Sequence, residues 1–110
     1  MPLLSIAIEH DVWQARGQDL MSALPAMRAM LCEKLDVGQE FSHLSVNPVF
    51  CPKDQTLVSA DLRVLGKEGR GADLLNEVAG ELQAMISSAC KHHASVRITT
   101  MDPAKYFTRR

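Results

Sequence analysis

Residues 3–9 read Leu-Leu-Ser-Ile-Ala-Ile-Glu, and residues 57–63 read Leu-Val-Ser-Ala-Asp-Leu-Arg. Both stretches are short and rich in aliphatic residues, which is typical of a β-strand. A shift of 54 residues superposes the first leucine and the serine of one stretch on those of the other. The same shift superposes Gly-Gln-Asp-Leu at 17–20 on Gly-Ala-Asp-Leu at 71–74. Matches at equivalent places indicate an internal repeat of about half the chain.

Hydrophobic periodicity predicts the other elements of each half. Leucines and methionines at spacings of three and four predict an amphipathic helix from Asp19 to Leu35. Pro25 lies inside this pattern, so the helix either starts late with Ser22 as its cap or is kinked. A second helix is expected from about Ala72 to Lys91, after a glycine-rich loop. The remaining strands are expected at Phe41–Phe50, Thr56–Leu65 and Ser95–Met101.

The order of these elements predicts an α+β fold in a single domain, residues 1–110. Two β-α-β units, about 2–50 and 56–102, would be related by pseudo-two-fold symmetry and form one four-stranded sheet with both helices on one face. We expect apolar strand residues on both faces of the sheet, so a partner subunit should cover the second face. The apolar strand residues in question are Leu3, Leu4, Ile6, Ile8, Leu57, Val58, Leu62, Val64 and Leu65.

The composition excludes several classes of protein. With 110 residues, 46% of them hydrophobic and 23% charged, the chain resembles an average globular domain rather than a disordered segment. A net charge of −1 does not favour a nucleic-acid partner. No apolar run reaches the length of a transmembrane helix, so no membrane partner is expected. The three cysteines Cys32, Cys51 and Cys90 are expected to be reduced thiols, and the start of the chain has no signal-peptide pattern, which favours a cytoplasmic location.

Two residues are candidates for chemistry. Pro2 would carry a secondary amine at the start of a buried strand if Met1 were removed, and burial would lower the pKa of that amine enough for it to act as a general base. Arg70 lies in the glycine-rich loop just before the second helix, where a guanidinium and backbone N–H groups could hold a carboxylate. Lys67 and Arg63 could add positive charge nearby. The structural alternatives are a proline that only promotes processing and an ordinary surface arginine.

Four features together resemble the tautomerase superfamily, and within it most closely the 5-carboxymethyl-2-hydroxymuconate isomerases. They are the proline after Met1, the β-α-β repeat of this length, Leu-Gly-Lys-Glu-Gly-Arg at 65–70, and Met-Asp-Pro-Ala-Lys-Tyr-Phe at 101–107. The resemblance implies a homotrimer that uses no metal or organic cofactor. It also implies that Pro2 is the catalytic base and that Arg70 binds the substrate.

The chain departs from this family pattern at one position. The family commonly has an arginine near the start of the second strand, where this sequence offers only His43 as a polar substitute. Imidazole binds an anion more weakly than guanidinium does. The resemblance implies an isomerase for a small unsaturated hydroxy or oxo dicarboxylate, and the missing arginine leaves two alternatives open. One is a non-catalytic ligand-binding or structural trimer, and the other is a phenylpyruvate-type keto-enol tautomerase.

Three other features are less informative. Tyr106-Phe107 could help a neighbouring subunit to close the site. His92-His93 beside Cys90 lacks a further ligand pair, so no metal site is expected. Cys51 is expected to be an incidental loop cysteine.

Overall fold

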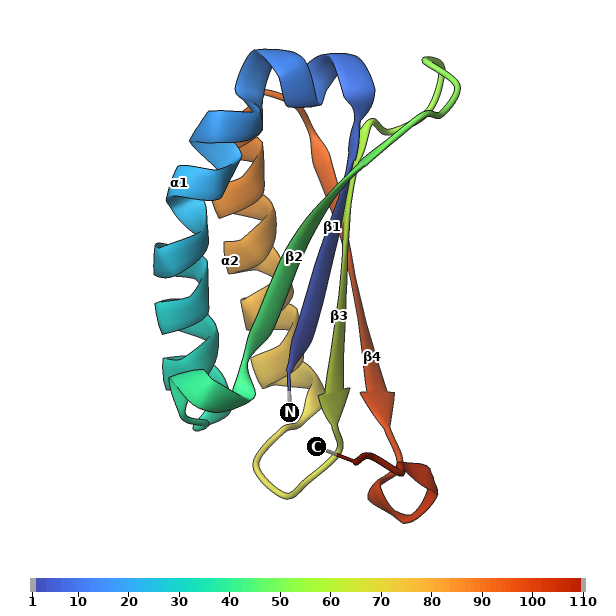
Figure 1. Ribbon diagram of the computed structural model, residues 1–110. Coiled ribbons are helices and arrows are strands. Elements are labelled where there is room, and N and C mark those ends of the chain that lie inside the picture. Colours follow the sequence, from blue (N-terminus) through green and yellow to red (C-terminus); the bar gives the residue numbers. More distant parts are fainter. Residues whose placement is uncertain (1, 110) are drawn as a thin grey trace.

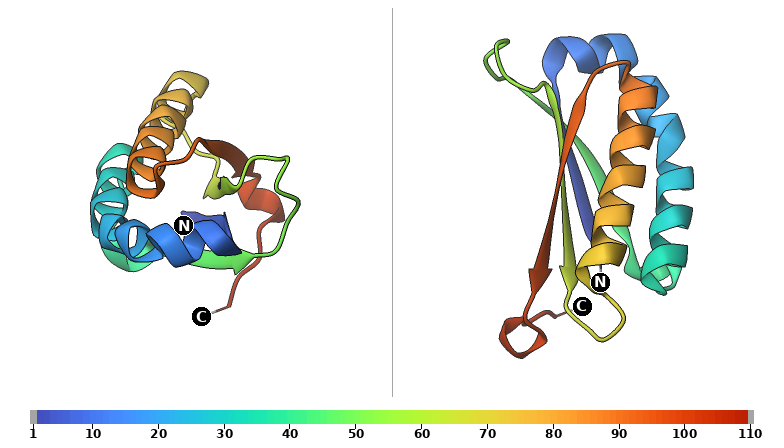
Figure 2. Two further views of the ribbon diagram at one scale, coloured as in Figure 1. Left: turned by 90° about the horizontal axis from the view of Figure 1, so that it is seen from above. Right: turned by 180° about the vertical axis from the view of Figure 1, so that it is seen from behind.

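The computed structural model describes residues 2–109 and shows a four-stranded sheet with two helices packed on one face (Figures 1 and 2). The strand order is β2-β1-β3-β4. The elements are β1 Leu3–Glu9, α1 His10–Leu35, β2 His43–Val49, β3 Val58–Leu65, α2 Ala72–Cys90 and β4 Ala94–Met101, with short 3-10 turns at Gln39–Phe41 and Pro103–Lys105.

The sheet is built from two β-α-β units. β1 pairs with β2 in parallel, and β3 pairs with β4 in parallel. The central pair, β1 and β3, is antiparallel and joins the two units. Each helix ends at a residue in the left-handed conformation, Asp36 with φ 55° and Lys91 with φ 57°. This arrangement confirms the expected α+β architecture with pseudo-two-fold symmetry and both helices on one face.

The first helix begins nine residues earlier than the sequence predicts. α1 starts at His10, directly after β1, and continues through Pro25 without a break. The cap is the side chain of Glu9, whose carboxylate accepts hydrogen bonds from the backbone N–H groups of Asp11 and Val12. Before residue 19 the helix buries only Val12 and Gly17, so this part carries almost none of the apolar periodicity by which a helix is recognised.

The Glu9 carboxylate also fixes the connection between β2 and β3. Lys53 in that connection lies 2.7 Å from Glu9 and also pairs with Asp11. The bond to Lys53 holds the pKa of both carboxyl groups below their usual range. The ring of Phe50 stacks on His10 with centroids 5.0 Å apart. Residues 50–53 are therefore tied to the first turn of α1, at the end of the sheet where β1 ends.

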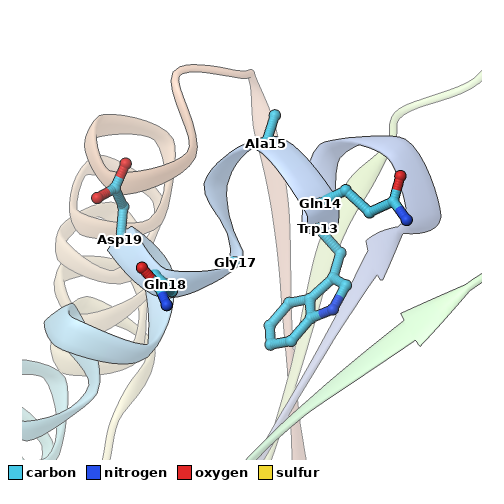
Figure 3. Close-up of a pocket in the computed structure, with 6 residues that line it drawn as sticks. All are labelled: Trp13, Gln14, Ala15, Gly17, Gln18 and Asp19. Carbon is cyan, nitrogen blue, oxygen red and sulfur yellow. The ribbon is translucent and has the colours of Figure 1, made fainter.

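Helix α1 bends near Gly17. Figure 1 shows its first turns crossing the end of the sheet and its remaining turns running beside α2. The indole ring of Trp13 lies close to Gly17, and a Cβ at that position would be 2.5 Å from the nearest ring atom. Figure 3 shows this ring among the residues that line a cavity of about 320 Å³, which are Trp13, Gln14, Ala15, Gly17, Gln18 and Asp19. Glycine fits at position 17 because the Trp13 ring occupies the place that a Cβ would take, and a larger residue would force the ring to move.

Alanine should therefore have opposite effects in the two helices. Gly17→Ala should lower the free energy of unfolding by about 1–2 kcal/mol, because the Trp13 ring must move out of its packed position. Gly80→Ala in α2 is the matched control, since a Cβ there has no heavy atom within 4 Å. It should raise the stability by about 0.5–1 kcal/mol through helix propensity alone. Denaturant unfolding measures both changes, and a Gly17→Ala chain as stable as the wild type would contradict the packing argument.

The two faces of the sheet differ sharply. The face toward the helices is apolar and includes six of the nine strand residues named above. These six are Leu4, Ile6, Ile8, Val58, Leu62 and Val64. The opposite face, which we call the helix-free face, carries mainly small polar and charged side chains. Its members include Ser5, Ser45, Asn47, Ser59, Asp61, Arg63, Ser95, Arg97 and Thr99.

The expectation of apolar residues on both faces was therefore wrong. Successive side chains of a strand point to opposite faces, and the apolar residues of β1 and β3 alternate with serine, aspartate and arginine. Of the residues named, only Leu3 and Leu65, near the strand ends, are strand residues on the helix-free face. Leu57 precedes β3. An uncovered apolar sheet face thus gives no argument for oligomerisation, and the expected trimer depends on the family resemblance.

Candidate active site

Pro2 lies at the end of the sheet where β1 begins. It is buried, and its carbonyl accepts a hydrogen bond of 3.0 Å from the backbone N–H of His43, which extends the pairing of β1 with β2 by one residue. Leu3 points to the helix-free face, so the alternation of side chains places the Pro2 ring on the helix side. The Pro2 nitrogen is a backbone atom at the very end of the strand and is not confined to either face.

Arg70 lies at the same end of the molecule, in the loop between β3 and α2 (Figure 1). Its side chain turns inward, and only 9% of the residue surface is exposed. Nη1 donates to the carbonyl of Leu65 at 2.8 Å, and Nη2 donates to the carbonyl of Leu35 at 3.0 Å. Burial lowers the pKa of the Arg70 guanidinium, and the charge of Asp36 acts in the opposite direction. The arginine therefore ties this loop to the last turn of α1.

The loop itself is shaped for this contact. The backbone N–H of Arg70 bonds to the carbonyl of Lys67 at 3.1 Å and closes a turn. Gly69 inside the turn has φ 88°, a conformation that favours glycine. A cation at the carboxyl end of a helix is also favoured by the helix dipole. The guanidinium Nε–H has no hydrogen-bond partner among residues 2–109, so one buried donor of Arg70 is uncommitted.

Pro2 and Arg70 bond to opposite ends of the connection between α1 and β2. Arg70 bonds to Leu35 at the start of that connection, and Pro2 bonds to His43 at its end. The structure thus places the two residues that the sequence singled out around one segment, at one end of the sheet. Their roles in chemistry remain predictions.

His43 is placed differently from the other two candidates. It is exposed on the helix-free face, directly beside Leu3 in the β1–β2 register. Arg70 lies on the other side of the sheet, against α1. The structure therefore does not bring the His43 imidazole and the Arg70 guanidinium to one face, and a joint role in binding one group is not apparent from their placement.

Arg63, which the sequence suggests only as a nearby positive charge, lies next to Leu3 in the sheet. It pairs with Leu3 from the strand opposite His43, so these two polar side chains flank Leu3 on the helix-free face. Arg63 also lines a cavity of about 350 Å³ together with Leu3, Ser5 and Asp61. The alternation of β3 places Arg63 and Asp61 on one face, but only the register with β1 shows that Arg63 lies beside Leu3, the residue that follows Pro2.

The remaining candidate features are Cys90, the neighbouring histidines and the tail, and the first two lie at the opposite end of the sheet from Pro2. His92 Nδ1 bonds to the backbone carbonyl of Cys90 at 2.9 Å. Burial raises the pKa of the Cys90 thiol. Among the residues that the structure describes, no three His, Cys, Asp or Glu side chains are grouped to hold a metal ion. The tail returns toward the end of the molecule at which Pro2 lies (Figure 1), with Phe107 88% exposed.

No membrane-spanning candidate is found among the helices of residues 2–109, since neither helix is both long and apolar enough to cross a bilayer.

Comparison of the structure with solved structures identifies the fold. A protein described as "W0 fused 4-OT wild type symmetric trimer" matches with a TM-score of 0.77 and 10% identity, over 97% of this chain and 93% of that one. The macrophage migration inhibitory factor of Toxoplasma gondii matches with a TM-score of 0.70 and 12% identity, over 96% and 95% of the two chains. The chain has the tautomerase/MIF-like fold. A domain of unknown function (DUF1904) from Sebaldella termitidis is similar, with a TM-score of 0.74 and 9% identity over 98% and 95%.

The tautomerase/MIF-like fold confirms the fold class expected from the sequence. At these identities the likeness concerns the fold alone. The sequence matches no protein-family model and no curated protein. The closer resemblance to 5-carboxymethyl-2-hydroxymuconate isomerases therefore remains a prediction, as do the substrate and the activity.

Proposed function

We propose that this chain is a cofactor-independent isomerase that moves a proton within a small unsaturated hydroxy or oxo dicarboxylate. The observation that carries the proposal is the placement of a buried Pro2 just before β1. Pro2 is bonded to His43 at one end of the connection between α1 and β2, and the Arg70 guanidinium is bonded to Leu35 at the other end. Fold neighbours that are described as fused 4-OT support it. The resemblance to 5-carboxymethyl-2-hydroxymuconate isomerases suggests a role in the degradation of aromatic compounds in the cytoplasm.

The mechanism needs a free amine at Pro2, so Met1 must be removed. A buried secondary amine close to a cation has its charged form disfavoured, which lowers its pKa and leaves a neutral base near pH 7. This amine would take a proton from one position of the substrate, the hydroxyl of a conjugated hydroxy acid or a carbon of an oxo acid, and leave a dienolate. The resulting ammonium would return the proton to a different carbon of the conjugated system, which restores the free amine.

Arg70 would stabilise the negative charge that develops on the dienolate. Its charge lies in a mostly buried setting, where electrostatic stabilisation is stronger than in water. Both terminal nitrogens already donate to backbone carbonyls and the Nε–H is buried, so a substrate carboxylate would have to replace one of the carbonyl contacts.

The proposed active form is a homotrimer. A fold neighbour with 97% coverage of this chain is described as a symmetric trimer, which supports this assembly. Strands of a neighbouring subunit and the tail residues Tyr106 and Phe107 would then exclude water from the site.

Two observations favour other functions. The commitment of Arg70 to Leu65 and Leu35 is what a purely structural arginine would show, and it favours a non-catalytic ligand-binding or structural trimer. The position of His43, away from Arg70, favours a phenylpyruvate-type keto-enol tautomerase that needs to hold only one carboxylate.

A screen of enol substrates on protein with a verified amino terminus tests the proposal. Intact mass separates chains that begin at Pro2 from chains that retain Met1, whose amide would block the base. We expect the Pro2 form to isomerise dicarboxylate enols and the Met1 form to be inactive on the same substrates. Turnover of monocarboxylate enols only would favour the phenylpyruvate-type activity. Absence of turnover by the Pro2 form would favour the non-catalytic trimer.

A further inference from the structure

We infer that the cavity on the helix-free face at the start of β1 binds a carboxylate group of a small dicarboxylate, with Arg63 as the cation that holds it. The identity of the ligand rests on the proposed function, whereas the binding of a carboxylate at this cavity can be tested without turnover. The cavity has a volume of about 350 Å³ and is lined by Leu3, Ser5, Asp61 and Arg63. Pockets for small molecules commonly begin near this size.

The strand register puts the cation where the proposed reaction needs it. Leu3 directly follows Pro2 and pairs with Arg63 across the central antiparallel strands. Paired side chains on adjacent strands have Cβ atoms about 5 Å apart. The Pro2 nitrogen lies one residue beyond Leu3, a rise of about 3.3 Å along the strand. A small molecule held by Arg63 can therefore lie over Leu3 and present its far end to Pro2.

The charges around the cavity favour an anion. Asp61 is the one acidic side chain in its lining, and Arg97 on the neighbouring strand lies 3.7 Å from the Asp61 carboxylate. Within residues 2–109, Arg63 takes part in no ion pair, so its positive charge is left uncompensated. A guanidinium binds a carboxylate through two parallel hydrogen bonds, which makes Arg63 well suited to this ligand.

The Ser5 hydroxyl adds an oriented donor. The Asn47 amide donates to Ser5 Oγ at 3.0 Å and approaches Ser45 Oγ at 3.3 Å. Because Ser5 Oγ accepts from Asn47, its own hydrogen is available to a ligand in the cavity. The apolar Leu3 side chain offers a surface for the carbon chain between the two ends of the ligand.

Binding of succinate to the full chain tests this inference. Succinate is a dicarboxylate without a conjugated system, so it can bind without being isomerised. Calorimetry gives its dissociation constant, and ¹H–¹⁵N NMR shows which amides respond. We expect shifts at Leu3, Ser5 and Arg63. Arg63→Met should weaken binding about tenfold or more, because a charge-assisted pair is lost.

Two variants make the test specific. Asp61→Asn removes the negative charge from the cavity and should tighten succinate binding several-fold. Arg16→Met removes a half-buried arginine on α1 that pairs with Asp19 and should leave binding unchanged. Wild-type affinity in Arg63→Met, weaker binding in Asp61→Asn, or shifts confined to residues 66–72 would overturn the inference.

The outcome is separable from the proposed function. Pro2→Ala leaves the cavity lining intact, so succinate should bind that variant as it binds the wild type. If the chain proves inactive but Arg63→Met still weakens succinate binding, the carboxylate site is supported and the isomerase proposal is wrong. If the enzyme is active but Arg63→Met changes neither succinate affinity nor KM, the carboxylate site fails and the isomerase proposal stands.

Discussion

Pro2→Ala should lower kcat by about 100-fold or more while changing KM far less, because a positioned general base contributes about 10²–10⁴-fold to a proton transfer. The proline ring fixes the backbone at the start of β1 and carries a secondary amine in a buried position. Alanine leaves a primary amine that rotates and is hydrated more easily. The charged form of this primary amine is then favoured, so a smaller fraction of the amine is neutral and able to act as a base at neutral pH.

Pro48→Ala is the matched control for this substitution. Pro48 is exposed on β2, an edge strand of the sheet, at the end away from Pro2, and takes no part in the proposed site. Steady-state kinetics on chains whose terminus is verified by mass should give Pro48→Ala a wild-type kcat. A normal kcat in Pro2→Ala would falsify the role of the amine as base.

Arg70→Met should lower the free energy of unfolding by about 2–3 kcal/mol, because the Leu65 and Leu35 carbonyls each lose a donor. The effect arises from the loss of the tie between the loop before α2 and the last turn of α1. The free energy of unfolding of Arg70→Lys should lie between those of the wild type and Arg70→Met. A single ammonium group cannot donate to both carbonyls as the two terminal nitrogens of the guanidinium do. Denaturant unfolding measures the difference.

The matched control for Arg70→Met is the same substitution at Arg63. The Arg63 side chain is exposed and makes no hydrogen bond or ion pair to another described residue, so Arg63→Met should change the stability by no more than about 0.5 kcal/mol. Equal stability losses in the two variants would show that the hydrogen bonds of Arg70 are not what stabilises this end of the fold.

The strand positions and the second helix could be predicted from the sequence, because these elements carry strong hydrophobic patterns. The expected strand at 3–9 has the bounds of β1, and α2 ends within one residue of the prediction. The start of α1 could not be predicted, since residues 10–18 have few buried side chains and the cap is a glutamate that also pairs with Lys53. That contact joins residues 44 positions apart, and no local pattern reveals it.

The candidate site was predicted only in part. Pro2 and Arg70 were identified from residue type and context, and the structure places both around the connection between α1 and β2. The bonds of Arg70 to two carbonyls were not foreseen, because they depend on where α1 ends in space. Arg63 was noted only as nearby charge, since its neighbours are set by the register of β1 with β3.

The sequence by itself determined the two β-α-β units, the α+β class and the residue types available for chemistry, because these follow from local periodicity and an internal repeat. Only the tertiary structure decided which face each strand residue occupies and which distant residues meet. The helix-free face proved polar, with serines, arginines and an aspartate between the buried aliphatic positions. The physical reason is that strand alternation separates neighbours in sequence onto opposite faces, while register joins residues that are far apart in the chain.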